Sequence, residues 1–400
     1  MSNIISGYAR NIIDQLPKGR LLALDVFRGI TIAAMILVNN PGSWSYVYAP
    51  MAHAKWHGWT PTDLIFPFFI FIAGVSVAIV MNRELAKGTD KLFLLKHALV
   101  RGIKLFALGL FLALFYYNFT NPAFSWVDAQ LFSVRVMGVL QRIGLVYFAT
   151  VFIVLYWQNL GRWLWAMGLL VGYWALVILV PYSDNSGNTY TGLLEFGNSL
   201  PAFIDNWVFA AKHLYYADAK PFAFDPEGLI STLPAISGCL AGVFTGNILT
   251  NNALSLSDKA KKMFVVGLVC VVVGEIWGLV FPINKALWTS SFVVMSSGWA
   301  LLSLAFLTWL IDIKGHKYWS APFVVCGANA IFFYMFAGVL ARLLMMIPIA
   351  QSSLGGWLFS EVFQPVFGNY NGSLMFAISF LFVSYWVLDY LYRKRIFFKV

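Results

Sequence analysis

The chain has 400 residues, of which 60% are hydrophobic and 11% charged, and its mean hydropathy is +0.75. A soluble globular protein carries roughly 25% charged residues, and so few charges cannot cover this much apolar surface in water. The composition therefore excludes a series of soluble domains and indicates a polytopic membrane protein. The net charge of +10 does not indicate a nucleic-acid partner, because the basic residues form short clusters between apolar runs.

Ten apolar runs approach or reach the roughly 20 residues that cross a bilayer, and they are continuous rather than alternating, which excludes a β-barrel. We expect membrane-spanning helices near 22–41, 63–82, 99–118, 136–156, 163–181, 228–249, 263–281, 288–311, 322–347 and 373–391. The predicted fold is all-α, with one transmembrane domain over 21–400. The polar segment 1–20 precedes it and shows no signal-peptide core.

Lysine and arginine gather on alternate sides of these spans. With a cytoplasmic N-terminus, 19 of them fall in cytoplasmic segments, five in external segments and three within spans. This bias predicts that both termini are cytoplasmic. The longest connection, 182–227, is then external and carries six acidic residues against two lysines. Such a loop could attract a cationic solute or simply be solvated.

Ionisable residues at membrane depth are the first functional candidates. Asp25 and Arg28 begin the first span, where an interfacial pair and a ligand site are both open interpretations. Arg142, in GVLQRIGLVYF, needs a carboxylate or an anionic ligand if it is buried. We expect Arg135, seven residues earlier, to share its helical face, and Glu275 is a candidate partner. The three cysteines lie in apolar runs and read as small buried residues rather than disulfides or metal ligands.

The connection between the first two spans concentrates the polar chemistry. It contains His53 and His57, four residues apart, without a third residue at ligand spacing, so we predict no metal site. One histidine is suited to act as a general base. Asp63 opens the second span and could orient an imidazole or cap the helix. Asn39, at the end of the first span, is a cap or a site residue. These residues leave an enzyme and a transporter both open.

The motifs resemble the catalytic membrane domain of the heparan-α-glucosaminide N-acetyltransferase family, and more closely its bacterial members. The resemblance extends over about 20–400, without the luminal domain of the animal members. It is carried by RLLALDVFRGITIAAMILVNN, HAKWHGWTPTDLIFPFFIFIAG, GVLQRIGLVYF, FDPEGLISTLPAI, FPINKALWTSSFV, GANAIFFYM and YRKRIFFKV.

The resemblance implies transfer of an acetyl group from cytoplasmic acetyl-CoA to the amine of a terminal glucosamine on the far side. It implies that His53 is the active-site histidine and Asn39 the catalytic asparagine, while His57 is not catalytic. Acetyl-CoA is then a co-substrate, and no permanently bound cofactor is expected. The residues that it implies for the acceptor sugar are Asp225, Glu227, Asn284, Lys285 and Trp288.

The chemistry of a thioester fits these roles. His53, oriented by Asp63, can accept the amine proton, and the Asn39 amide can donate to the thioester carbonyl. CoA phosphates cannot enter lipid, so we expect them near basic groups at the inner face. The candidates for this contact are Arg28, Arg393, Lys394, Arg395 and Lys399. Arg142 lies deeper and is expected either to order the site or to contact the pantetheine arm or the pyrophosphate. One-step transfer is expected rather than an acetyl-His53 intermediate.

Two other functions remain open on the sequence. The first is a transporter for N-acetylglucosamine or another amino sugar, and the weaker second is a polysaccharide O-acyltransferase. The acceptor is expected to be glucosamine or a terminal glucosaminide. The resemblance favours a bacterial cytoplasmic membrane and a homodimer.

Overall fold

The computed structural model describes residues 2–17 and 21–398. Its α-helices are α1 Ser2–Ile13, α2 Leu22–Asn39, α3 Ile65–Ala86, α4 Lys91–Leu114, α5 Val139–Tyr156, α6 Asn159–Leu179, α7 Leu200–Phe209, α8 Thr232–Thr250, α9 Leu256–Gly278, α10 Ser290–Leu307, α11 Ala321–Ala328, α12 Ala330–Met346, α13 Leu354–Trp357, α14 Gln364–Phe367 and α15 Asn369–Arg393. Two short helical segments matter below, η2 Pro61–Leu64 before α3 and η5 Thr308–Ile313 after α10.

Within the described residues, the strands are six two-residue segments paired into three antiparallel hairpins. They are β1 Tyr182–Ser183 with β2 Thr189–Tyr190, β3 Leu194–Glu195 with β4 Asn198–Ser199, and β5 Pro348–Ile349 with β6 Ser352–Ser353. All six lie in the segments that connect helices, so they pair at the ends of helices and do not form a core sheet.

The described chain contains eight helices that are long and apolar enough to cross a membrane, and the bent pair α11–α12 makes a ninth. The protein is therefore an all-α polytopic membrane protein, which confirms the fold class predicted from composition. Each of the ten expected segments is helical. The expected segment that is not among the nine candidate membrane-spanning helices is α9. It is long enough, but Lys261, Lys262 and Glu275 make it more charged than the others.

Two expected spans differ from the structure in shape. The third begins at Lys91 rather than near 99, because the Asp90 side chain accepts from the Phe93 N–H at 2.9 Å and caps α4. The ninth is not straight, since α11 and α12 meet at Asn329 with a bend of 74°. The expected spans therefore identify the right helices, but they do not predict where α4 begins or that the ninth span is bent.

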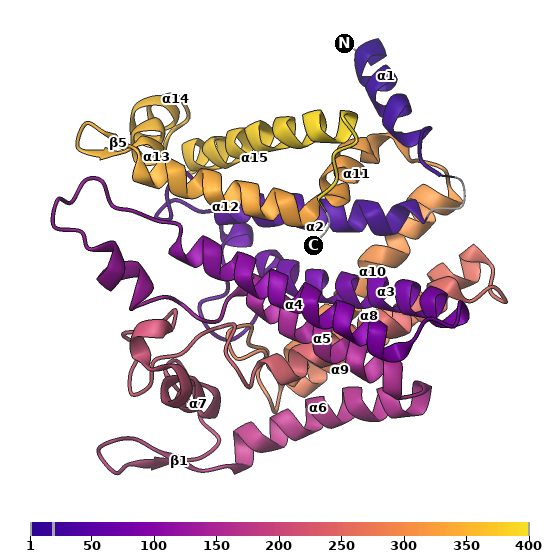
Figure 1. Cartoon of the computed structure of the whole chain (residues 1–400), viewed down its shortest axis with the longest axis horizontal. Coiled ribbons are helices and arrows are strands. Elements are labelled where there is room, and N and C mark those ends of the chain that lie inside the picture. The colour runs from indigo at the N-terminus through magenta and orange to yellow at the C-terminus, as the bar shows by residue number, and fades with distance from the viewer. Residues whose placement is uncertain (1, 18–20, 399–400) are drawn as a thin grey trace.

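The long helices run alongside one another, with α2, α11, α12 and α15 on one side of the bundle and α3–α6 and α8–α10 on the other (Figure 1). Helices α3 and α8 approach closely because glycines face backbone. A Cβ on Gly74 would lie 1.8 Å from the Cys239 carbonyl oxygen, and one on Gly242 would lie 2.0 Å from that of Phe71. Small residues of this kind let helices in lipid pack at short distance.

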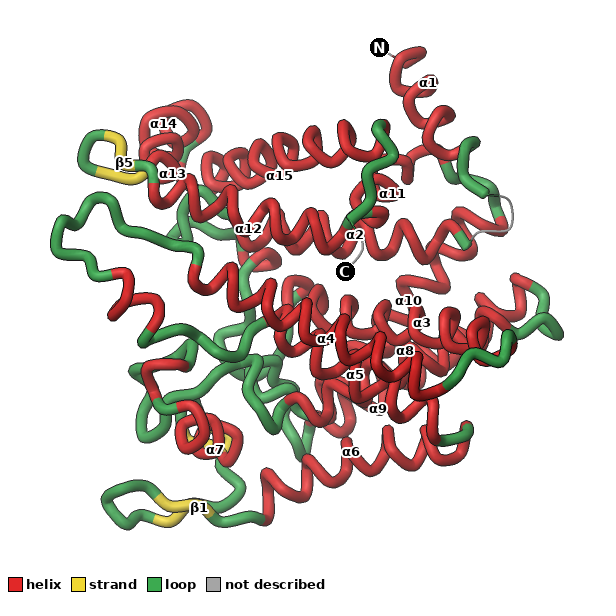
Figure 2. Tube along the Cα trace, viewed as in Figure 1, coloured by secondary structure: helices red, strands yellow, loops and turns green. Residues whose placement is uncertain are grey.

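The connections expected outside the cell gather at one end of the bundle, where Figure 2 shows the β1 and β5 hairpins and α7. Helix α1 lies at the opposite end. Its Ala9, Ile12 and Ile13 are buried, and the Tyr8 hydroxyl donates to Asp389 of α15 at 2.7 Å. The described part of segment 1–20 therefore packs as part of the helical domain.

Candidate active site

A histidine and a buried carboxylate form the centre of the site. His53 Nδ1 lies 2.7 Å from Asp63 Oδ1, in the segment that leads into α3. The other oxygen of Asp63 accepts from the backbone N–H groups of Ala54 and Thr60, both at 3.0 Å. Asp63 is 1% exposed. The two interpretations of Asp63 therefore hold together, because the same side chain caps the helix start and orients the imidazole.

Lys285 reaches the same pair from the connection between α9 and α10. Its Nζ lies 3.0 Å from His53 Nδ1 and 3.5 Å from Asp63 Oδ1. Burial lowers the pKa of Lys285, against the opposing effect of the Asp63 and Glu227 carboxylates. The site thus holds an imidazole between a fixed carboxylate and a lysine amine.

Asn284 joins the histidine segment to the lysine segment. Its Nδ2 donates to the Trp56 carbonyl at 3.0 Å, and its Oδ1 accepts from the Leu287 N–H at 2.8 Å. His57 lies against the same amide, with 3.4 Å between Nδ1 and Asn284 Nδ2, and burial lowers the pKa of His57. His57 therefore belongs to the support of the loop, apart from His53.

A second charged cluster faces the first across a cavity. The Arg135 guanidinium donates from Nε to Asp225 Oδ2 at 2.7 Å and from Nη2 to Asp225 Oδ1 at 2.6 Å, and it also bonds Glu227. Burial would raise the pKa of Glu227, but Arg135, Arg142 and Lys285 together lower it. Sequence reasoning noted Arg135 only for its spacing, and that interpretation was wrong, because α5 begins at Val139 and Arg135 precedes it.

Arg142 is completely buried and lies away from the cavity walls described below. Its Nη2 donates to the Gly228 carbonyl at 3.0 Å and to the Ser231 hydroxyl, and its guanidinium lies 4.9 Å from the Trp288 ring. The expected contact with CoA does not fit this burial. Glu275 is not its partner either, since that carboxylate is exposed near the end of α9 and accepts from Trp59 Nε1 at 3.1 Å.

Three of the residues expected to bind the sugar are part of the scaffold. Asp225, Asn284 and Trp288 are 2%, 0% and 1% exposed, and a direct sugar contact would require the core to open. Glu227 and Lys285, by contrast, lie on a cavity wall. Of the five residues expected to bind the acceptor sugar, two therefore line this cavity and three belong to the protein core.

The outer cavity has a volume of about 240 Å³ and includes His53, Asp63, Lys285, Glu227 and Asn39 in its wall. Asn39 is the last residue of α2, and its neighbour Asn40 is the C-cap residue, donating to the Ile36 carbonyl at 2.7 Å. Asn39 therefore faces the cavity while Asn40 ends the helix.

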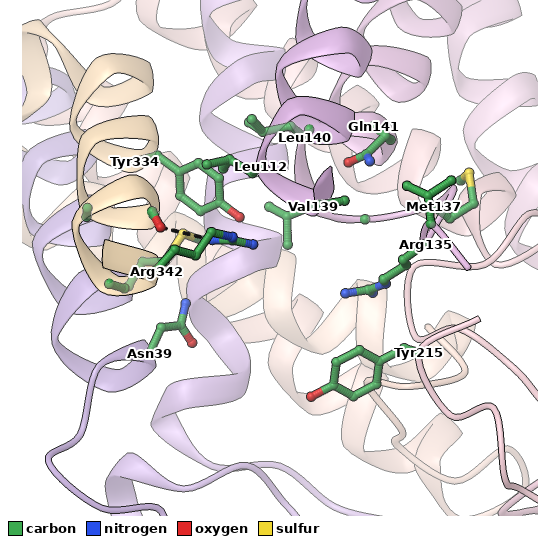
Figure 3. Close-up of a pocket in the computed structure, with 18 of the residues that line it drawn as sticks. Asn39, Leu112, Arg135, Met137, Val139, Leu140, Gln141, Tyr215, Tyr334 and Arg342 are labelled. Carbon is green, nitrogen blue, oxygen red and sulfur yellow. Dashed lines mark hydrogen bonds between the residues drawn. The ribbon is translucent and has the colours of Figure 1, made fainter. Parts of the chain in front are cut away.

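The central cavity has a volume of about 470 Å³ and shares Asn39, Arg135 and Tyr215 with the outer one. Figure 3 shows Arg342 of α12 extending into this cavity beside the Tyr334 hydroxyl, with Arg135 on the opposite wall. Arg342 Nη1 donates to the Gly338 carbonyl at 3.0 Å. The sequence signal for Arg342 was an arginine inside an apolar span, but nothing in the sequence linked it to Asn39.

A third, inner cavity of about 480 Å³ lies along the same helices toward the other end of the bundle. Arg28, Arg101, Asn329 and Phe398 are among its lining residues, and Leu140 belongs to the walls of both the inner and the central cavity. Arg28 donates to the Ser76 hydroxyl at 3.2 Å and lies 3.6 Å from Asp25. The three cavities thus follow one another from the Arg28 end to His53.

Of the described C-terminal basic residues, one forms an ion pair and two are exposed. Arg393 donates to Asp389 at 2.7 Å and lies 5.2 Å above the Tyr8 ring, so it holds α1 on α15. Lys394 and Arg395 are exposed in the turn that follows. Lys399 lies outside the described residues.

Residues 20–276 match the family described as heparan-alpha-glucosaminide N-acetyltransferase, catalytic. The chain belongs to this family. It is 29% identical over 359 residues to heparan-alpha-glucosaminide N-acetyltransferase of Homo sapiens and 28% identical over 359 residues to that of Mus musculus. These alignments cover 79% of the chain and 52% and 53% of the relatives, so the chain spans about half the length of the curated relatives it matches. The family resemblance expected from the motifs is confirmed.

Proposed function

We propose that this protein is an N-acetyltransferase that passes acetyl from acetyl-CoA to the amine of glucosamine or a terminal glucosaminide at the opposite membrane face. One observation carries the proposal, namely three consecutive cavities that lead from Arg28 to the fixed His53–Asp63 pair. Family membership supports the same reaction class.

The outer cavity is the proposed acceptor site. The His53 side chain is 47% exposed, so an amine can reach it, while Asp63 holds the ring in one orientation. A general base must lie within hydrogen-bond reach of the proton it removes, and Nε2, which Asp63 does not bond and which lies 3.3 Å from Lys285 Nζ, is the proposed nitrogen. Glu227 on the same wall provides an acceptor for sugar hydroxyls or for the incoming ammonium.

The inner and central cavities are the proposed donor route. The CoA phosphates stay beside Arg28 and Arg101, because the cost of placing phosphate in an apolar interior is prohibitive without cationic partners. The acyl arm then extends past Leu140 toward Arg342 and Asn39. This assignment replaces Arg142 with Arg101 as the second arginine of the donor site.

The groups present support transfer in one step. The sugar nitrogen attacks the thioester carbon, His53 accepts the nitrogen-bound proton, and the Asn39 amide donates to the developing oxyanion. We place the protein in a bacterial cytoplasmic membrane, as a homodimer, on the strength of the sequence resemblance.

An amino-sugar transporter would also use cavities that lead from one face to the other. It would not need an imidazole fixed by a carboxylate with 1% exposure, and this favours the enzyme.

The test uses the full chain purified in detergent, with acetyl-CoA and glucosamine, and follows N-acetylglucosamine and free thiol together. The wild type should form both in equal amounts, and His53→Ala should retain acetyl-CoA binding while losing on the order of 10²–10⁴-fold in rate. Sugar uptake by proteoliposomes, with no acetylated product from any amine, would establish the transporter instead.

A further inference from the structure

Lys285 is placed where a proton can pass through it. Its Nζ is 3.0 Å from His53 Nδ1, the nitrogen that faces Asp63, and 3.3 Å from His53 Nε2, the nitrogen proposed to face the substrate amine. The side chain is 19% exposed and lies on the wall of the outer cavity. Lys285 therefore contacts both the histidine and the space in which the reaction is proposed to occur.

The segment that carries Lys285 is held in one conformation. Trp288 has φ 51°, a left-handed backbone that bulky residues rarely adopt, and it is 1% exposed. Its ring packs against Phe66 and Phe292 at centroid distances of 5.1 and 5.4 Å. The backbone N–H of Trp288 donates to the Lys285 carbonyl at 3.1 Å. Such strain persists only where the surroundings determine it, and here it fixes the residue that faces His53.

The proposed reaction needs a proton donor that has not yet been assigned. Attack by the amine releases one proton to His53, and expulsion of CoA leaves a basic alkyl thiolate that requires one proton. Water in the outer cavity is one source. Alternatively, a side chain in the same cavity can relay the proton from His53 to the leaving thiolate without water.

We infer that Lys285 carries the proton from His53 to the sulfur of the leaving CoA, a role that rests on the proposed acetyltransferase function. The C–N bond forms and the nitrogen proton moves to His53 Nε2. His53 is then doubly protonated, with its Nδ1 proton still directed at Asp63. The C–S bond breaks, the electron pair stays on sulfur, and the sulfur takes a proton from the Lys285 ammonium group. The proton on His53 Nε2 moves to Lys285 Nζ, 3.3 Å away, so that amide and thiol leave with His53 neutral and Lys285 protonated as at the start.

The electrostatic surroundings are compatible with this cycle. Burial lowers the pKa of Lys285, while Asp63 and Glu227 oppose that effect, so the amine can both accept and release a proton. An arginine at the same position would keep its charge at all relevant pH values and could not take part.

The experiment compares two small donors without a nucleotide, S-acetyl-N-acetylcysteamine and S-acetylthiophenol, with glucosamine as acceptor. The aryl thiolate is a weak base and leaves without a proton, whereas the alkyl thiolate needs one. Lys285→Met should reduce kcat with the alkyl donor by on the order of 10²–10⁴-fold and affect the aryl donor much less. Lys285→Arg should behave like Lys285→Met, and it keeps a cation beside Asp63 if the methionine variant folds poorly.

Lys212→Met is the matched control, because Lys212 is exposed in the same external region and lies outside the three cavities. It should leave both donors unaffected. Equal losses with the two donors, or recovery by arginine, would overturn the proton-transfer role and leave a positioning role in its place. Absence of transfer by the wild type from either donor and from acetyl-CoA would instead refute the proposed function, and this role with it.

Discussion

Arg135 and Asp225 form a two-point ion pair across 90 residues of chain, with N–O distances of 2.7 and 2.6 Å. The same guanidinium bonds Glu227, so one residue fastens the 182–227 connection to the segment before α5. Both carboxylates are almost completely buried, at 2% and 7% exposure. The Arg135 guanidinium is thus the cation that pairs directly with both carboxylates.

Replacing that cation should destabilise the protein strongly. Arg135→Met removes the ion-pair partner of two buried carboxylates, and breaking a buried pair in this way costs about 3–5 kcal/mol. Arg83→Met is the control, because Arg83 pairs with Glu84 at 3.1 Å with 64% of its side chain exposed, and such pairs contribute about 0–1 kcal/mol. Unfolding in mixed detergent micelles measures both. Equal unfolding midpoints for the two variants would contradict the structural role of Arg135.

Asp63→Asn should separate orientation of His53 from capping of the helix. An asparagine can keep part of the cap but presents no charge to His53 Nδ1, so we expect kcat to fall by about 10²-fold or more with little change in acetyl-CoA binding. Thr60→Ala is the matched variant. It removes the 3.1 Å hydroxyl bond to Asp63 and leaves the His53 contact in place. If Thr60→Ala reduces kcat as much as Asp63→Asn does, loop position rather than His53 orientation limits the rate.

Local signals predicted most of the helices and brought together part of the candidate site. Apolar runs determine where the chain crosses lipid, and Asp63 lies only 10 residues from His53, so one motif contained both. Lys285 contacts His53 from 232 residues away and Arg135 meets Asp225 from 90 residues away, which no local pattern can specify. The sequence also could not show which candidate side chains are buried. Asp225 and Trp288 carry groups that suit a sugar, but they point into the protein core.

The donor assignment predicts different results for two arginines near the same membrane face. Arg28→Gln should weaken acetyl-CoA binding by on the order of 10- to 100-fold, since a hydrogen bond to a charged group contributes about 1.5–3 kcal/mol. Arg393→Gln should leave binding nearly unchanged, because Arg393 pairs with Asp389 outside the inner cavity. Calorimetric titration with desulfo-CoA or CoA measures the difference. The assignment fails if Arg393→Gln weakens binding and Arg28→Gln does not.

Asp205 should make the stability of the 182–227 region depend on pH near neutrality. It is 1% exposed in α7, and burial raises its pKa to about 7, with a smaller contribution from Asp225 and an opposing one from Arg142. Its carboxyl group accepts from the Leu229 N–H at 2.8 Å and the Asp225 N–H at 3.3 Å. The folded state holds a proton on Asp205 over a range in which the unfolded chain has lost it. Stability from this group is therefore fully present below pH about 4 and is lost as the pH rises through about 7.

The melting temperature of the wild type should fall between pH 5 and pH 8. Asp205→Asn, which cannot titrate, should flatten that part of the profile while keeping an acceptor for the same N–H groups. A profile for Asp205→Asn that falls as steeply as the wild type would assign the pH dependence to another group.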